Sequence, residues 1–375
     1  MANDISQIGV VAKNEIIKCA RGRKFLISLV IVFVVFLLIT GLQFVMDSWD
    51  NLDSIGALTE AYLSTFPMVI VLIVALLSSI ALVSEFEERT ALILFTRPVR
   101  RTSILIGKIL ACTIVEALII LVYYILVATV GFLKIDGMSL NFLTSFGFAV
   151  MYAFATSGVA FVISAFLKKS SVCTVISILL MLVIFPIVST MVEANDGESW
   201  YMIDQAGETI YTCIPEYVDR YNETLDQIGN VVDSAVAILK GFTDDGMTNG
   251  ITWLSGNIFS AEYFMADETT QQAVLTALTS GDSAAIMEYH QYINPSFLAI
   301  QDASTQASIL QMFMFLTMGA DGNLSGMIMV LEMMNSMTAL QPMDPPDLLK
   351  EFLVLLVWGI AGYLIAWIKF IRREF

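Results

Sequence analysis

The stretch that decides the fold is residues 85–101, which read EFEERTALILFTRPVRR between two strongly apolar runs. Its acidic residues come first and its basic residues last. Glu85 and Arg89 stand four residues apart with the acid first, which is the better order for an ion pair on an exposed helix. Pro98 disfavours helical geometry at the residue before it, so we expect the helix to end near Thr96. The pattern indicates a short helix at a membrane surface, a turn, and a second helix that enters the bilayer. A charged loop that only anchors two spans is the simpler alternative.

The composition indicates an integral membrane protein. Hydrophobic residues make up 57% of the 375 residues, and charged residues make up 14%. Soluble domains have about 45–50% apolar and about 25% charged residues. Crossing the hydrocarbon layer takes about 20 apolar residues in a helix. Six segments are predicted to cross: Phe25–Met46, Phe66–Val83, Ile109–Phe132, Leu143–Leu167, Val172–Val192 and Phe352–Ile368.

The basic residues predict the orientation of these spans. All but four of the 19 Lys and Arg residues fall on one side of a six-span arrangement, the exceptions being Lys134, Arg220, Lys240 and Lys350. Because cytoplasmic loops carry the excess of Lys and Arg, both termini are expected in the cytoplasm of the cell and the chain in its cell membrane. Most acidic residues fall on the other side. The net charge of -16 does not suggest a nucleic-acid binder.

We expect an all-α polytopic membrane protein with three parts. Residues 1–193 would form the membrane domain, and its first 24 residues have the apolar spacing of an amphipathic interfacial helix. Residues 194–347 would form a mainly helical extracytoplasmic domain between spans five and six. Residues 348–375 would form the sixth span and a cytoplasmic tail. Asn222 and Asn323 begin glycosylation triplets, which are a weak signal.

The residues outside the spans carry no enzyme motif. The phosphate-binding pattern GxxxxGK[ST] is absent, so we expect no nucleotide to bind this chain alone. The single histidine, His290, is far more typical of a structural residue than of a catalytic one. Met residues are frequent between residues 312 and 343, and thioethers bind Cu(I). Their Leu, Ile, Val and Phe neighbours favour apolar packing instead, so we expect no metal or other cofactor.

Glu116 is the one charged residue inside the predicted third span. An ionisable side chain there costs a few kcal/mol unless it faces protein, water or a partner. It could line a transport path or pair across a subunit interface. It could equally be a carboxyl satisfied by Tyr123, Tyr124 or a nearby hydroxyl, or lie close enough to the surface to remain hydrated.

The charged stretch resembles the cytoplasmic signature of type-2 ATP-binding-cassette (ABC) permeases. That family typically shows an acid, a Gly-Thr pair, a Ser/Thr-Arg-Pro-Val-x-Arg run and a Gly-Lys pair that opens the third span. Here Glu85 supplies the acid, Arg89-Thr90 replaces Gly-Thr, and residues 96–101 with Gly107-Lys108 supply the rest. Residues 11–25 also look like the family's N-terminal interfacial helix. The resemblance covers the six-span plan and not the outer domain.

The resemblance implies a permease subunit, usually an exporter, that works with a separate P-loop ATPase. ATP and Mg would bind to that partner, and two permease copies, as a homodimer in contact with membrane lipids, would form the path. Residues 85–101 would be the coupling helix that docks on the ATPase. The resemblance implies that eight residues of this stretch either contact the ATPase or form the turn. They are Glu85, Glu87, Glu88, Arg89, Thr90, Arg97, Pro98 and Arg101.

Two other classes remain open on the sequence. A membrane-anchored extracytoplasmic binding or sensor protein would use the spans only to hold its outer domain, although six spans are many for an anchor. An ion-driven carrier or channel often shows inverted repeats and several buried charges, whereas this sequence shows no repeat and one such charge.

Overall fold

The computed structural model describes residues 4–87, 100–135, 137, 139–195, 197–227, 256–280, 283–299 and 342–372. The chain divides into two compact units: the first joins Met1–Asn222 to Met343–Phe375, and the second is Glu223–Pro342. The described part of both units is helical, and its one β contact is the isolated bridge between Phe259 and Ile293. An all-helical fold is therefore confirmed for the described residues.

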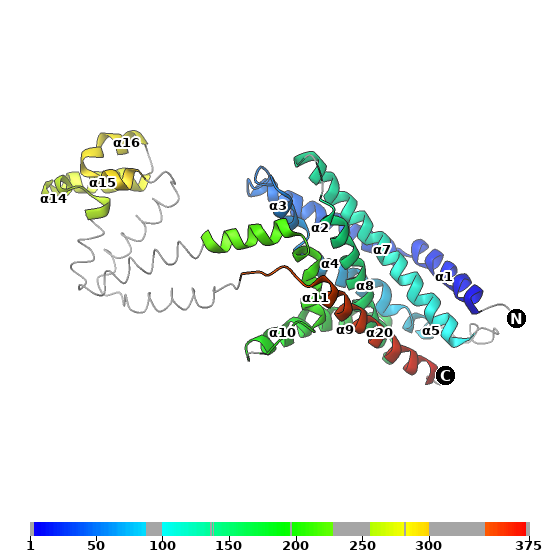
Figure 1. The fold of residues 1–375 in the computed structure, drawn as a ribbon. Helices are drawn as coiled ribbons and strands as arrows, with labels where there is room; N and C mark the ends of the chain where they lie inside the picture. The colour runs from blue at the N-terminus through cyan, green and yellow to red at the C-terminus, as the bar shows by residue number, and fades with distance from the viewer. Residues whose placement is uncertain are drawn as a thin grey trace. The chain divides into compact units, whose positions relative to one another are not determined.

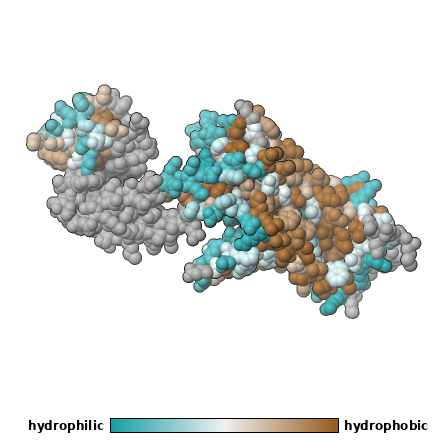
Figure 2. All heavy atoms as spheres, viewed as in Figure 1, coloured by the Kyte–Doolittle hydropathy of each residue, from teal (hydrophilic) through white to brown (hydrophobic). Residues whose placement is uncertain are grey.

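The first unit contains six helical segments long and apolar enough to cross a membrane within the described residues. They are Arg23–Val45 (α2), Phe66–Glu85, Arg101–Lys134 (α7), Asn141–Phe166 (α8), Ser170–Glu193 and Leu348–Arg372 (α20). Figure 2 shows apolar side chains over the middle of this unit and polar ones toward its ends. The six predicted spans are thereby confirmed as helices.

Two of the spans are interrupted. The second consists of α4 (Phe66–Leu77), the 3-10 turn η1 (Ser78–Ile80) and α5 (Val83–Glu87). The fifth consists of α9 (Ser170–Leu179), the π-helical turn η2 (Leu180–Ile184) and α10 (Phe185–Glu193). The wider π turn ends two residues before Pro186, whose ring would collide with a carbonyl of the preceding turn in a regular helix.

The helix α8 is the centre of the first unit and packs against α20, α11, α7, α4 and α9. Figure 1 shows α20 crossing α8 within the bundle. At the crossing, a Cβ on Gly158 would lie 2.7 Å from the carbonyl oxygen of Gly359, and one on Gly362 would lie 2.5 Å from the carbonyl carbon of Gly158. The missing side chains let the two backbones touch, as small residues do between membrane helices.

Three shorter helices complete the first unit. The helix α1 (Asp4–Arg21) confirms the predicted N-terminal helix, and it packs along α7. The helix α3 (Ile55–Tyr62) is capped by the preceding residue, Ser54, whose side chain accepts a hydrogen bond from the Ala57 amide. The helix α11 (Ile203–Thr212) packs on α8 and α20.

The packing of α11 differs from the expected division of the chain at residue 194. Ile203, Ala206 and Ile210 form its buried apolar face, and Ser145 of α8 donates a hydrogen bond to the Ile210 carbonyl. Residues 194–222 therefore belong to the same compact unit as the spans. Extracytoplasmic placement of residues 194–347 stays a prediction.

The second unit is described over residues 223–227, 256–280, 283–299 and 342. It contains α14 (Ala261–Met265), α15 (Glu268–Ser280), α16 (Ser283–Glu288), η3 (His290–Tyr292) and α17 (Pro295–Leu298). Phe259 stacks on Tyr263 with ring centroids 3.9 Å apart. His290 is exposed, and its Nδ1 lies 2.9 Å from the Met287 carbonyl oxygen. The Met-rich segment up to residue 341 and the Asn323 triplet lie outside the described residues.

The contact between α8 and α20 predicts that Gly158→Ala destabilises the first unit. The new methyl group would meet the backbone of Gly359, which is less free to move than a side chain. Such overpacking costs about 1–3 kcal/mol. We expect a lower thermal unfolding midpoint for the detergent-solubilised chain. Gly147→Ala is the matched control, because a Cβ there meets nothing within 4 Å in the same helix. Equal midpoints for the two variants would contradict the close contact.

Candidate functional site

The pair Gly107-Lys108 lies in the N-terminal part of the long helix α7. At 34 residues α7 is about 51 Å long, whereas the hydrocarbon layer is about 30 Å thick. A Cβ on Gly107 would lie 2.7 Å from Cγ1 of Val11 and 3.2 Å from the Ile8 carbonyl oxygen. The glycine therefore lets α1 pack directly on the backbone of α7, which brings the next residue, Lys108, against α1.

Lys108 is the centre of a buried ion cluster, defined here as Glu15, Lys18, Glu85 and Lys108. Its side chain is 2% exposed, and its Nζ lies 2.9 Å from Oε1 of Glu15 and 3.0 Å from Oε1 of Glu85. Lys18 Nζ lies 2.9 Å from the same Glu85 oxygen. A buried charge is tolerated only when it is paired and hydrogen-bonded. The two lysines and two glutamates balance each other and join α1, α5 and α7.

Two further contacts connect the same end of the unit to the fifth and sixth spans. Glu87 accepts hydrogen bonds from the backbone amide of Ser170 at 3.0 Å and from its hydroxyl, at the start of α9. The bond from the Ser170 hydroxyl has the larger effect and the bond from its amide the smaller one, and together they hold the pKa of Glu87 below its usual value. Arg101 Nη1 donates to the Ile371 carbonyl at 2.9 Å, near the end of α20. Charged residues of the predicted coupling stretch thus reach both spans.

The structure describes three of the eight residues predicted for ATPase coupling. Glu85 differs from the expected surface contact: it is 9% exposed, because the two lysines and the neighbouring helices enclose it. Glu87 and Arg101 make the contacts given above. Residues outside the described part of the chain are Glu88, Arg89, Thr90, Arg97 and Pro98, together with the expected helix end near Thr96.

Sequence reasoning named Lys108 only as part of the Gly107-Lys108 pair of the signature, and it did not predict that this lysine pairs with carboxylates. The other two members of the ion cluster were not singled out. Glu15 and Lys18 read as ordinary polar positions of an amphipathic helix. Their pairing depends on how α1 packs against α7, which no spacing in the sequence reveals.

Glu116 lies fully buried in the core of the first unit, beside the interruption in the second span. Ser78 of η1 donates a hydrogen bond to its Oε1 at 2.6 Å, and Ser157 of α8 donates to Ser78 at 2.7 Å. The other carboxylate oxygen, Oε2, has no hydrogen-bond partner among the described residues. Of the partners considered from sequence, a nearby hydroxyl is the one found. Tyr123 donates instead to the Tyr62 carbonyl, and the Tyr124 hydroxyl pairs with Ser145.

The polar groups at the interruption of the second span find hydrogen-bond partners in side chains of neighbouring spans. The backbone amides of Leu82 and Val83 both donate to the Ser164 hydroxyl of α8 at 3.1 Å. The Ser79 hydroxyl lies 3.3 Å from that of Thr174 in α9. Backbone amides freed within a membrane need such partners, since lipid offers none. The regular helix of the second span is therefore interrupted at a fixed place, between α4 and the charged helix α5.

The ion cluster predicts a large penalty for removing Lys108 alone. Lys108→Met leaves two enclosed carboxylates with one half-exposed lysine, and breaking a buried pair costs about 3–5 kcal/mol. We expect a strong fall in the thermal unfolding midpoint. The triple variant Glu15→Gln/Glu85→Gln/Lys108→Met should recover much of it, because no unpaired carboxylate is left.

Lys13→Met on the exposed face of α1 is the control and should melt like the wild type. If the single Lys108 variant melted no lower than this control, or no lower than the triple variant, the cluster would not hold α1 and α5 to α7.

Comparison with known proteins identifies the family of the chain. The sequence model of a family described as "ABC-2 family transporter protein" matches residues 10–199, just over half of the chain. The match covers every member of the ion cluster, both interrupted spans and Glu116. No curated protein gives a match to the sequence. The chain therefore belongs to the ABC-2 transporter family, and it is a multi-pass membrane permease component of an ABC transporter rather than its ATPase.

Proposed function

We propose that the chain is the permease of an exporter that an ATPase subunit drives through residues 85–101. The observation that carries this proposal is the ion cluster, which connects α5 to both α1 and α7. In the proposed mechanism the ATPase binds the coupling stretch, and ATP binding and hydrolysis displace it. Because Glu85 is bonded to Lys18 and Lys108, a displacement of α5 would be passed to both helices.

The division of labour follows from the family. ABC-2 permeases generally work with an ATP-binding P-loop subunit, so ATP and Mg would bind to that partner and no cofactor to this chain. The interruption at η1 supports a mechanical role for α5, since a helix that ends at a fixed turn can swing as a rigid piece. Export is the direction that the resemblance implies, because proteins of this kind usually move substrate outward.

The proposed orientation places the ion cluster at the cytoplasmic end of the unit. Most Lys and Arg residues belong to segments at that end, which the positive-inside rule assigns to the cytoplasm. Both termini would then be cytoplasmic and residues 194–347 extracytoplasmic. The contacts of Glu87 with Ser170 and of Arg101 with Ile371 would lie at the same end and spread the movement of α5 to the fifth and sixth spans.

We place Glu116 on the substrate path rather than at a subunit interface. It is fully enclosed within one chain, and its hydrogen-bond partner Ser78 belongs to the interruption of the second span. A movement of α5 would reach this turn first and would open the polar group around Glu116 to the path. Its unpartnered oxygen is then available to a substrate or to water.

A second copy of this chain is the proposed partner within the membrane. The spans Arg23–Val45 and Ser170–Glu193 are the two least buried of the six described. Their apolar faces need either lipid or a second permease as a neighbour, and the resemblance implies two permease copies. Membrane lipids would cover the remainder.

The docking proposal is tested by Glu88→Lys/Arg89→Glu in the tagged chain. Glu85 is left unchanged, because it belongs to the ion cluster. We expect the wild type to be purified in mild detergent with a stoichiometric P-loop ATPase, and the reversed pair to lose that subunit and its permease-dependent ATP hydrolysis. Asp53→Lys, an exposed site in the loop after the first span, should keep both.

Protein level and thermal midpoint report whether each variant has inserted and folded. A folded Glu88→Lys/Arg89→Glu variant that retained the ATPase and its full activity would refute docking through this stretch.

The path proposal is tested by comparing Glu116→Gln with Glu116→Ala. Glutamine keeps an oxygen that can accept the Ser78 hydrogen bond and nearly the same volume, so the midpoint should stay close to the wild type. Alanine leaves a cavity and should cost about 2–5 kcal/mol. If Glu116 serves the path, Glu116→Gln lowers permease-dependent ATP hydrolysis without lowering the midpoint. Full activity in that variant would mean that the carboxyl group is structural.

A further inference from the structure

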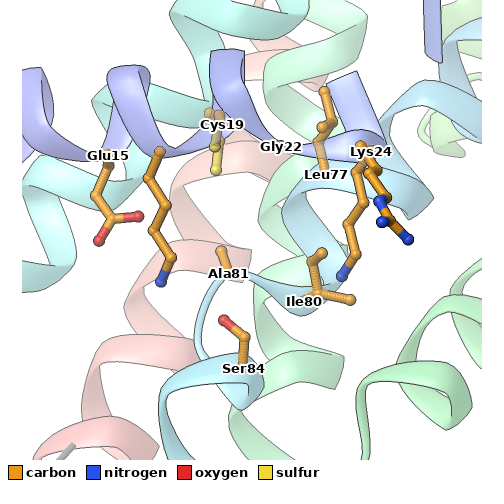
Figure 3. A pocket seen from close by; sticks show the side chains of 11 residues that line it. Glu15, Cys19, Gly22, Lys24, Leu77, Ile80, Ala81 and Ser84 are labelled. Carbon is orange, nitrogen blue, oxygen red and sulfur yellow. The ribbon is translucent and has the colours of Figure 1, made fainter. Parts of the chain in front are cut away.

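A cavity of about 270 Å³ lies between the α1–α2 corner and the interrupted second span. Figure 3 shows side chains of the corner above it and Leu77, Ile80, Ala81 and Ser84 of the second span around it. Cys112 of α7 also lines it. All of these residues belong to the first unit. The cavity is close to the lower end of the range of about 300–1,000 Å³ for ligand pockets, so it would hold part of a larger molecule.

The corner that covers the cavity is cationic, whereas its floor is apolar. Lys18, Arg23 and Lys24 all line it. The one acid among the described lining residues is Glu15, whose Oε1 is bonded to Lys108. The second span contributes mainly aliphatic surface through Leu77, Ile80 and Ala81. A molecule that suits such a cavity has an anionic group at one end and a hydrocarbon chain at the other.

The start of α2 adds a second feature that favours an anion. Gly22 is the N-cap of this 23-residue helix and offers no side chain to its first amides. Uncapped amides and the helix dipole attract anions, above all phosphate. Arg23 and Lys24 are exposed at the same point, and Lys18 keeps a half-exposed side chain despite its bond to Glu85. Three cationic side chains and the N-terminus of α2 thus lie around the same cavity.

The level of the cavity, at the start of the first span, points to the source of the anion. Arg23 is the first residue of the first span, so the cationic corner lies where the chain enters the apolar layer. Basic residues at this level bind anionic lipid head groups. We infer that the cavity binds one anionic phospholipid, with its phosphate at Arg23 and Lys24 and the upper part of an acyl chain against Leu77 and Ile80. This inference does not depend on the proposed coupling mechanism.

The test uses the full-length chain in a mild detergent at about 150 mM salt, which screens loose surface attraction beyond about 8 Å. The chain is titrated with dioleoyl phosphatidylglycerol, dioleoyl phosphatidylcholine or inorganic phosphate. Bound lipids are counted by native mass spectrometry, and the thermal midpoint is followed in parallel. We expect one phosphatidylglycerol to remain bound and raise the midpoint, and the other two probes to do neither.

Two variants remove the two halves of the site. Arg23→Gln/Lys24→Gln removes two cations, each worth about 1 kcal/mol near a membrane surface, and should weaken phosphatidylglycerol binding about thirtyfold. Ala81→Leu fills the floor without a change of charge and should also weaken it. Lys168→Gln/Lys169→Gln is the matched control, because it neutralises two exposed cations before the fifth span, outside the cavity. It should bind like the wild type.

Several results would overturn the inference. Equal weakening in the control would mean a general attraction of anionic lipid to basic surface. Binding of phosphate as strong as that of phosphatidylglycerol would mean a free-anion site. Unchanged binding in both Arg23→Gln/Lys24→Gln and Ala81→Leu would place the lipid elsewhere on the chain. The midpoints of the variants without lipid show that each is folded, so that lost binding is not lost structure.

Discussion

The structure of the membrane unit depends on the burial of one positive charge. Lys108 lies on a helix that must pack against others, and its ammonium group has lost nearly all contact with solvent. Such a charge costs several kcal/mol unless opposite charges and hydrogen bonds compensate it. Glu15 and Glu85 do so from two different helices, so the position of α7 determines where α1 and α5 must lie. The glycine before Lys108 makes the arrangement sterically feasible, because α1 approaches the backbone of α7 there.

A second constraint acts in the core, where backbone amides must find partners away from water. The second span stops being a regular helix at Ser78 and resumes at Val83. Hydroxyl groups of α8 serve both sides of this gap: Ser164 accepts from two amides, and Ser157 bonds to Ser78, which in turn bonds to Glu116. The central helix α8 therefore holds the interrupted part of the second span in place. It also holds α20, through the contacts of Gly158.

These two constraints divide the second span into parts with different attachments. The α4 part belongs to the apolar core, where Phe66 stacks on Tyr123 with ring centroids 4.1 Å apart. The α5 part begins at Val83, which is buried in the core, and its acidic residues bond to Lys18, Lys108 and Ser170. The part of the span that precedes the signature stretch is thus attached to α1, α7 and α9 by polar contacts, whereas the part before the interruption is attached by apolar packing.

The sequence by itself determined the class of protein, the six spans and the family. Each of these follows from local information: runs of apolar residues long enough to cross a bilayer, the asymmetry of basic residues, and a short signature. It also located the charged stretch and Glu116 as unusual positions. Their environments could be described only as alternatives, because burial and bonding depend on residues far away in the chain.

Only the tertiary structure decided which side chains those positions meet. Glu15 and Lys108 are 93 positions apart in the sequence, and α11 lies beyond the predicted edge of the membrane domain yet packs inside it. Glu85 reads as a surface acid by its neighbours in sequence and becomes an enclosed partner of two lysines in the fold. Local patterns state how polar each segment is. The pairing of charges and hydroxyls is settled by how the helices cross, because a buried polar group takes whichever partner the packing brings within hydrogen-bond distance.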